Sequence, residues 1–163
     1  MLSLGAAAFN SKGTYLGSFY TNLKPLPEAK QSPDTMRWWG EHQEAYQKAT
    51  ENQVDPKLAM QNFVRWVKGF NGIPVFVAYP AGFDFTFVHW YIVHFLGKDP
   101  FSFSALDIKS YAMAKLNLPY RQSIKRNYPR EWFKSLTTKH THVASDDARE
   151  QGELFFKIRE YSV

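Results

Sequence analysis

The fold is decided by residues 73–97, which read IPVFVAYPAGFDFTFVHWYIVHFLG. The first seven form a continuous apolar run, which is typical of a strand buried on both faces. Pro80 and its neighbours predict a turn, and the apolar residues from Phe83 onward predict a helix that ends at Gly97. Asp84 and two histidines interrupt the apolar residues, so the segment does not qualify as a membrane span. A buried strand leading directly into a helix predicts an α/β arrangement.

The segments on either side extend this pattern. Two apolar runs joined by Asn-Ser-Lys-Gly predict a β-hairpin at the start of the chain. The clearest helix follows Asp55, which can cap it, and its apolar residues recur at three-and-four spacing. The whole order predicts a single domain over residues 1–163, with one mixed sheet flanked by helices. The expected segments are residues 2–10, 13–23, 32–52 (capped by Ser32 or Asp34), 55–72, 102–118 and 144–161.

Composition narrows the class of protein. The 163 residues are enough for one domain with a sizeable core, and 44% of them are hydrophobic, which argues against disorder. The chain has no cysteine, so it has neither a disulfide framework nor a thiolate metal site. Its first ten residues lack a basic start and a long apolar run, so they make a poor signal peptide. These features predict a cytoplasmic protein with no membrane contact.

Positive charge is concentrated late in the chain. The net charge is +5, and residues 121–139 carry six Lys or Arg against one acid, Glu131. Aromatic residues at Tyr128, Trp132 and Phe133 are interleaved with these cations. Such a block suits a nucleic acid, because cations displace phosphate counterions and rings can stack on bases. A solvated loop and helix face is the alternative explanation.

Asp84 is the first candidate site residue. It falls in the first turn of the predicted apolar helix, between Phe83 and Phe85. A carboxylate in apolar surroundings needs a helix N-terminus, a base or a metal ion as its partner. A simple helix cap and a chemical role both fit this position.

His142 and Asp147 are the second candidate, within HTHVASDDA at residues 140–148. On one helix their side chains would diverge, so they converge only if His142 lies on the incoming loop and Asp147 in the first turn. Ser145 is expected to cap that helix. His140 is expected to touch phosphate or solvent, and Asp146 to point away. Capping plus a surface histidine is the alternative here too.

These two sites, about sixty residues apart, resemble two motifs of the DEDDh 3'–5' exonucleases, a family with a ribonuclease-H-like fold. Phe83–Asp84 matches the second motif, and His142-x-Ala-x-x-Asp147-Ala matches the third in full. Residues 105–116 (ALDIKSYAMAKL) and the N-terminal hairpin are also similar to that family. TMRWWGEHQ, residues 35–43, resembles the Trp-rich helix of its exoribonuclease-like branch.

The resemblance implies roles for individual residues. Asp84 and Asp147 would be ligands of two Mg²⁺ or Mn²⁺ ions, and His142 would be the general base. Phe83 and Phe87 would contact the substrate, the 3' end of single-stranded DNA or RNA. Asp107, which precedes another predicted helix, is expected to be a helix cap.

One part of the family pattern is not found. The family has four carboxylates, and the first two belong to an Asp-x-Glu on a central strand, whereas no acidic residue precedes Glu28 here. The chain is therefore expected to be truncated at its N-terminus relative to the family, to bind metal weakly and to cleave slowly. The neighbours of the missing strand would close up, pair with another chain, for example in a homodimer, or leave the gap open in a marginally stable protein.

Two other functions remain open at this stage. A non-catalytic homologue would bind nucleic acid through its basic block without cleaving it. An unrelated α/β domain would use these histidine and aspartate residues only as helix caps.

Overall fold

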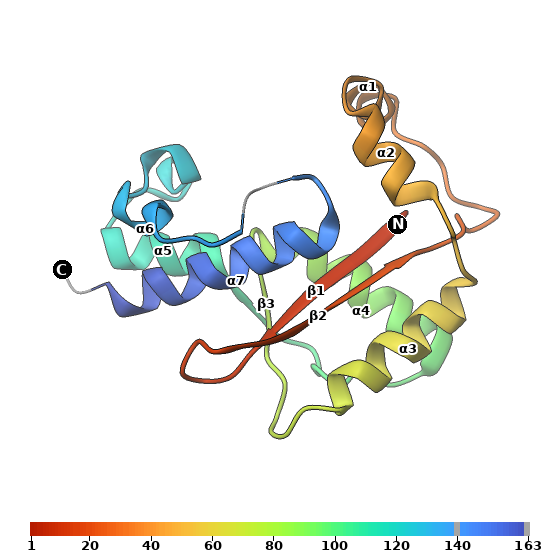
Figure 1. Ribbon diagram of the computed structural model, residues 1–163, viewed down its shortest axis with the longest axis horizontal. Coiled ribbons are helices and arrows are strands. Elements are labelled where there is room, and N and C mark those ends of the chain that lie inside the picture. Colours follow the sequence, from red (N-terminus) through yellow and green to blue (C-terminus); the bar gives the residue numbers. More distant parts are fainter. Residues whose placement is uncertain (139–140, 162–163) are drawn as a thin grey trace.

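The opening hairpin is formed as the sequence predicts. The computed structural model describes residues 1–138 and 141–161, and Figure 1 shows the arrangement of their elements. Strands β1 (Ser3–Phe9) and β2 (Tyr15–Asn22) pair antiparallel. The Asn10 side chain closes their turn by accepting the backbone N–H groups of Lys12 and Thr14, each at 3.0 Å. This local polar chemistry fixes the register of the hairpin.

The next segment holds two helices, so the single helix expected over residues 32–52 is wrong. Helices α1 (Pro33–Glu41) and α2 (Gln43–Thr50) are separated at His42, whose φ of −127° and ψ of 54° are not helical. Ser32 caps α1 as predicted, by accepting the N–H of Thr35. The pair lies at one end of the molecule (Figure 1), where the side chains of Tyr20 and Asn22 in β2 bond to the carbonyl oxygen of Lys48 in α2.

Helix α3 (Pro56–Lys68) confirms its sequence signals. The Asp55 side chain accepts the N–H groups of Lys57 and Leu58, and the helix ends at Gly69. These capping bonds satisfy donors that the first helical turn leaves without intrahelical partners.

The decisive strand–helix segment is present, but its strand is shorter than expected. Strand β3 (Phe76–Ala78) is followed by helix α4 (Ala81–Leu96), which ends at Gly97 with φ 78°. Ile73 is 93% exposed and Val75 is 66% exposed, so the prediction that they lie in a buried strand is wrong. Pro74 between them has no N–H to donate to a ladder, which explains why pairing begins only at Phe76.

The remaining elements follow in the expected order. Strand β4 (Ala105–Asp107) pairs parallel to β3 and leads into helix α5 (Ile108–Leu116). Two short 3₁₀ helices, η1 (Tyr120–Gln122) and η2 (Lys125–Asn127), and helix α6 (Glu131–Lys134) form the basic segment. The last helix is α7 (Ala144–Glu160). No helix within the described ranges is both long and apolar enough to cross a bilayer.

The strands form two small sheets, which corrects the expectation of one mixed sheet. Among the described residues, β1 pairs only with β2, and β3 pairs only with β4. The chain is an α/β protein, with one antiparallel and one parallel pair. In the part of the chain that the structure describes, no ladder of hydrogen bonds joins β1 to β3. Helix α7 packs against both strands.

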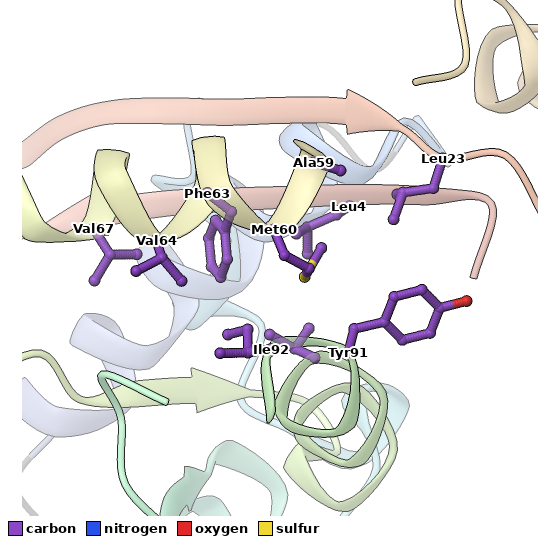
Figure 2. Close-up of a cluster of buried hydrophobic side chains, with 10 residues drawn as sticks. Leu4, Leu23, Ala59, Met60, Phe63, Val64, Val67, Tyr91 and Ile92 are labelled. Atoms are coloured by element: carbon purple, nitrogen blue, oxygen red, sulfur yellow. The ribbon is translucent and has the colours of Figure 1, made fainter. Parts of the chain in front are cut away.

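The main core lies between α3, α4 and the hairpin. Figure 2 shows the apolar face of α3 directed toward Ile92 and Tyr91 of α4, with Leu4 of β1 beside it. Phe63 and Ile92 are almost completely buried, as the three-and-four spacing of α3 requires. A second cluster joins α5, α6 and α7; its buried members are Ile108, Ala112, Tyr128, Trp132, Leu154 and Ile158.

Helix α7 approaches β1 very closely. At Gly5 the backbone of Ala144 and Ser145 occupies the space that a Cβ atom would need. Farther along, the rings of Phe9 and Phe156 pack together with centroids 5.7 Å apart. Glycine at position 5 therefore sets how near the start of α7 comes to the hairpin.

We expect Gly5→Ala to destabilise the fold, because its methyl group overlaps backbone atoms that cannot move without displacing α7. The loss should be about 1–3 kcal/mol in the free energy of unfolding, measured by urea denaturation. Gly40→Ala is the matched control, since Gly40 is an exposed residue of α1 with open space around it. The control should be neutral or gain up to about 1 kcal/mol. Equal stability of the two variants would contradict the packing described here.

Candidate active site

Asp84 is a half-buried carboxylate in the first turn of α4. Within the described residues its oxygens take part in no hydrogen bond or ion pair. Burial raises the pKa of Asp84 from its ordinary value of 3.8 to about 6. Asp84 does not cap the helix, because Pro80 occupies the cap position. A desolvated carboxylate without a partner is costly to the fold and is a frequent mark of a functional site.

The capping role at α4 belongs instead to Asp107, at the end of the neighbouring strand. Its Oδ2 accepts the N–H of Ala81 at 2.8 Å, and its Oδ1 accepts the N–H of Ser110 at 2.7 Å. Burial alone would raise the pKa of Asp107, but the hydrogen bonds from Ser110 and Ala81 outweigh it and the pKa lies below its usual value. The predicted cap of α5 is confirmed, and this carboxylate also fixes the start of α4.

His142 and Asp147 are held together at the start of α7. His142 lies on the incoming loop with φ 61°, and Asp147 lies in the first turn of the helix. Oδ1 of Asp147 accepts the backbone N–H groups of Thr141 and His142, both at 3.2 Å. The structure thus has the loop-and-first-turn arrangement that convergence of the two residues requires.

The predicted cap at Ser145 is wrong. Helix α7 already begins at Ala144, Val143 occupies the cap position, and no side chain caps the helix there. The loop before α7 is held instead by the carboxylate of Asp147, which accepts the N–H groups of Thr141 and His142. Asp146 accepts the hydroxyl of Thr141 at 2.8 Å, so it also supports this loop. His140 lies outside the described residues.

The imidazole of His142 rests against the α1–α2 pair. Its ring is 5.1 Å from that of Trp38 and 4.9 Å from that of His42, both in edge-on geometry. His42 stacks in turn on Trp38 and bonds to its carbonyl oxygen through Nδ1 at 2.9 Å. A hollow of about 590 Å³ opens beside the two histidines, between the junction of α1 with α2 and the loop before α7.

The elements that carry Asp84 and Asp147 meet at Tyr79. The N–H of Tyr79 donates to the side chain of Gln151 at 2.9 Å. Gln151 lies four residues after Asp147 on α7, so the two share a helix face about 6 Å apart along the axis. Helix α4 begins two residues after Tyr79. The first turn of α4 and the N-terminal half of α7 are therefore anchored to the same backbone position.

Comparison with known proteins shows the family of the chain. A family profile described as "3'-5' exoribonuclease Rv2179c-like domain" matches residues 1–158. The chain belongs to this family. The predicted resemblance to 3'–5' exonucleases is confirmed by that match.

A curated relative supports the same assignment. The Escherichia coli protein named "3'-5' DNA exonuclease Cap18" is 33% identical over 166 residues, which cover 99% of this chain and 83% of the relative. The name of the Rv2179c-like family refers to RNA and the name of the relative to DNA. The shared property is a 3'–5' exonuclease lineage.

Two exposed rings flank Asp84 in this member of the Rv2179c-like family. Phe83 is 63% exposed and Phe87 is 43% exposed, with their rings 5.1 Å apart in edge-on geometry. They lie one helical turn apart on the solvent side of α4. Both rings are therefore accessible from solvent, and their contact with a substrate stays a prediction.

Some supporting residues were missed in the sequence. The bond from Ala81 of α4 to Asp107 could have been predicted from the sequence. An aspartate at the carboxyl end of a parallel strand can face the neighbouring strand–helix turn. No sequence pattern predicts the ion pair of Lys125 with Glu150, because the two residues are 25 positions apart. Both oxygens of Glu150 accept from the Lys125 ammonium at 2.9 Å, which fixes the basic segment to α7.

The carboxylates of Asp84 and Asp147 have the oxygen atoms that a divalent cation prefers, but two carboxylates are an incomplete set of ligands. Oxygen ligands are those that Mg²⁺ and Mn²⁺ prefer. Within the parts of the chain described here, however, no group of three or more His, Asp or Glu side chains is arranged to hold a metal ion. The family resemblance expects Asp84 and Asp147 to be metal ligands, and two carboxylates are fewer than such a group needs.

Asp84→Asn should stabilise the protein above pH 6. The pKa of Asp84 is higher in the folded than in the unfolded chain, so the wild-type fold loses stability as pH rises from about 4 to 6. The full penalty is up to about 3 kcal/mol, and the variant removes it. Urea denaturation at pH 4, 6 and 8 should show a difference that grows with pH. A variant less stable than wild type at pH 8 would show that the carboxylate is not desolvated.

Proposed function

We propose that this protein removes nucleotides from the 3' end of single-stranded nucleic acid by hydrolysing the terminal phosphodiester bond. The observation that carries the proposal is the joined placement of His142 and Asp147 at the start of α7. Membership of the 3'–5' exoribonuclease Rv2179c-like family supports the reaction, and the name of the relative extends it to DNA. The chemistry is the same for both nucleic acids, since the scissile group is a phosphodiester.

His142 is the general base in this proposal. A neutral imidazole nitrogen can accept the proton of an attacking water. The bond from its backbone N–H to Asp147 fixes the loop that carries it. Phe83 and Phe87 offer rings on which the terminal bases can stack.

Asp84 and Asp147 are the proposed ligands for Mg²⁺ or Mn²⁺, in a two-ion site of the DEDDh type. The raised pKa of Asp84 supports this role, because a bound cation would supply the partner that its carboxylate lacks. The incomplete donor set argues for weak binding by this chain alone. We therefore propose slow cleavage until further carboxylates are supplied.

A ribonuclease-H-like sheet would bring those carboxylates. In that arrangement a strand with Asp-x-Glu lies between β1 and β3 and joins the two small sheets into one mixed sheet. The separation of the β1–β2 and β3–β4 pairs is consistent with such a place. Helix α7 already spans both pairs, through Gly5 on one side and Tyr79 on the other. A second copy of the chain in a homodimer is another possible source of the pairing strand.

A test compares DNA and RNA 15-mers carrying a 5' label, with Mn²⁺ and with EDTA. We expect slow shortening from the 3' end that needs Mn²⁺. Asp147→Asn and Asp84→Asn should abolish it, and His142→Ala should lower the rate by about 10²- to 10⁴-fold. Asp146→Asn is the matched control, because it changes the same chemical group one residue away and should keep most of the activity.

The outcome separates this proposal from a second candidate, a non-catalytic nucleic-acid-binding protein. The incomplete donor set favours that candidate. Oligonucleotide binding with no Mn²⁺-dependent shortening, even at high protein concentration and after fusion of an Asp-x-Glu strand, would support it and contradict the exonuclease.

A further inference from the structure

The basic segment and the start of α5 present a surface that the candidate active site does not use. Glu131 is the only acid between residues 120 and 138. Exposed cations follow one another over η1, η2 and α6, and an exposed tyrosine lies next to them. We call this surface the basic platform, and its members are Lys109, Tyr120, Arg121, Arg126, Arg130 and Lys134.

In the described part of the chain, the cations of the basic platform are not neutralised by nearby carboxylates through ion pairs. Lys125 of the same segment differs, because Glu150 neutralises it and its side chain is only 31% exposed. Between residues 120 and 138, Lys125 therefore binds the segment to α7, whereas the other cations are exposed to solvent. An unneutralised set of exposed cations is the electrostatic footprint of a polyanion partner.

Tyr120 adds an aromatic surface to the same region. Its side chain is 51% exposed, and the Lys109 ammonium lies 4.1 Å from the centre of its ring. The ammonium covers one face of the ring and adds a positive charge beside it. Bases stack on exposed rings with little sequence preference, and cations alongside contact the phosphates. A ring and cations together favour a single-stranded nucleic acid over an acidic protein.

The basic platform is connected to the candidate active site. Tyr79, which precedes the turn of Asp84, donates its hydroxyl to the carbonyl oxygen of Ser123 between η1 and η2, at 3.4 Å. Lys125 in η2 is bound to Glu150, one helical turn after Asp147 on α7. The segment is thus fixed to both elements that supply the candidate metal ligands.

We propose that the basic platform binds the part of a single-stranded nucleic acid that lies 5' to the nucleotide being removed. This proposal rests on the proposed function for the position of the 3' end at Asp84 and Asp147. It adds a second contact region, which would hold a long strand during successive cleavages. Recognition comes from phosphate charge and base stacking, so it is independent of sequence.

Binding without cleavage tests the proposal directly. Fluorescence anisotropy with a 5'-labelled (dT)₁₅ in EDTA is compared for the wild type and a variant with Arg121, Arg126, Arg130 and Lys134 changed to Gln. We expect about 10- to 100-fold weaker binding at 50 mM salt, and a salt slope smaller by about 3 for four lost phosphate contacts.

A control variant that loses the same number of charges elsewhere tests whether the effect is specific to the basic platform. Lys24, Lys30, Lys57 and Lys68 are also exposed, and they belong to other segments, namely the loop between β2 and α1 and helix α3, which Figure 1 shows apart from α5 and α6. Changing these four to Gln should leave the affinity within about twofold, since local contacts outweigh net charge at distances beyond the Debye length. Equal loss in both variants, or no loss in the platform variant, would overturn the proposal.

The stacking component is tested at Tyr120. Tyr120→Ala should weaken binding of (dT)₁₅ by about 5- to 100-fold, whereas Tyr120→Phe should bind like the wild type. An abasic 15-mer should show no difference between these variants, because it has phosphates but no bases. Equal effects of Tyr120→Ala on both oligonucleotides would refute stacking.

The binding assay also separates this proposal from the proposed function. Asp147→Asn should keep its affinity for (dT)₁₅ in EDTA, since it leaves the basic platform intact. Binding that depends on the platform in a protein that never cleaves would refute the exonuclease alone. Cleavage of a 15-mer that is unaffected by the platform variant would refute the platform alone.

Discussion

The close packing of α7 on β1 is the contact on which the candidate site depends. Strand β1 offers Gly5 and Ala7 on the face toward α7, because alternate residues of a strand share a face, so the helix backbone can come near. From this position α7 reaches across to β3, where Gln151 accepts the N–H of Tyr79. One helix is thereby held against both strand pairs, and its first turn carries Asp147. A small side chain in the hairpin thus determines where an acidic residue about 140 positions later can lie.

Three aspartates at the starts of helices have different electrostatic environments. Asp107 accepts hydrogen bonds at the starts of two helices, and its pKa is lowered. Asp147 accepts two backbone N–H groups of the loop that carries His142. Asp84 is partly desolvated without such bonds, and its pKa is raised. The first carboxylate stabilises the fold, whereas the third destabilises it, which is the usual pattern where a residue is kept for chemistry rather than for stability.

Several elements could be predicted because their signals are local. The Asn10 turn, the Asp55 and Ser32 caps and the ends of α3 and α4 at glycines all depend on residues within about four positions. Errors arose where distant contacts decide. The break at His42 coincides with its contact with the ring of His142, 100 positions later, and the strand expected from Ile73 starts only where β4 offers a partner at Phe76. The single mixed sheet failed for the same reason, since strand pairing is not local.

The candidate site follows the same division. By itself the sequence determined the residue types and their order: a carboxylate after a buried strand, and a histidine five residues before an aspartate at the start of the last helix. Motif spacing was enough to identify the exonuclease lineage. Only the tertiary structure decided which acids are satisfied and which are not, because their partners come from far along the chain. Ala81 reaches Asp107 across 26 residues and Lys125 reaches Glu150 across 25, whereas Asp84 is partly buried and has no partner among residues 1–138 and 141–161.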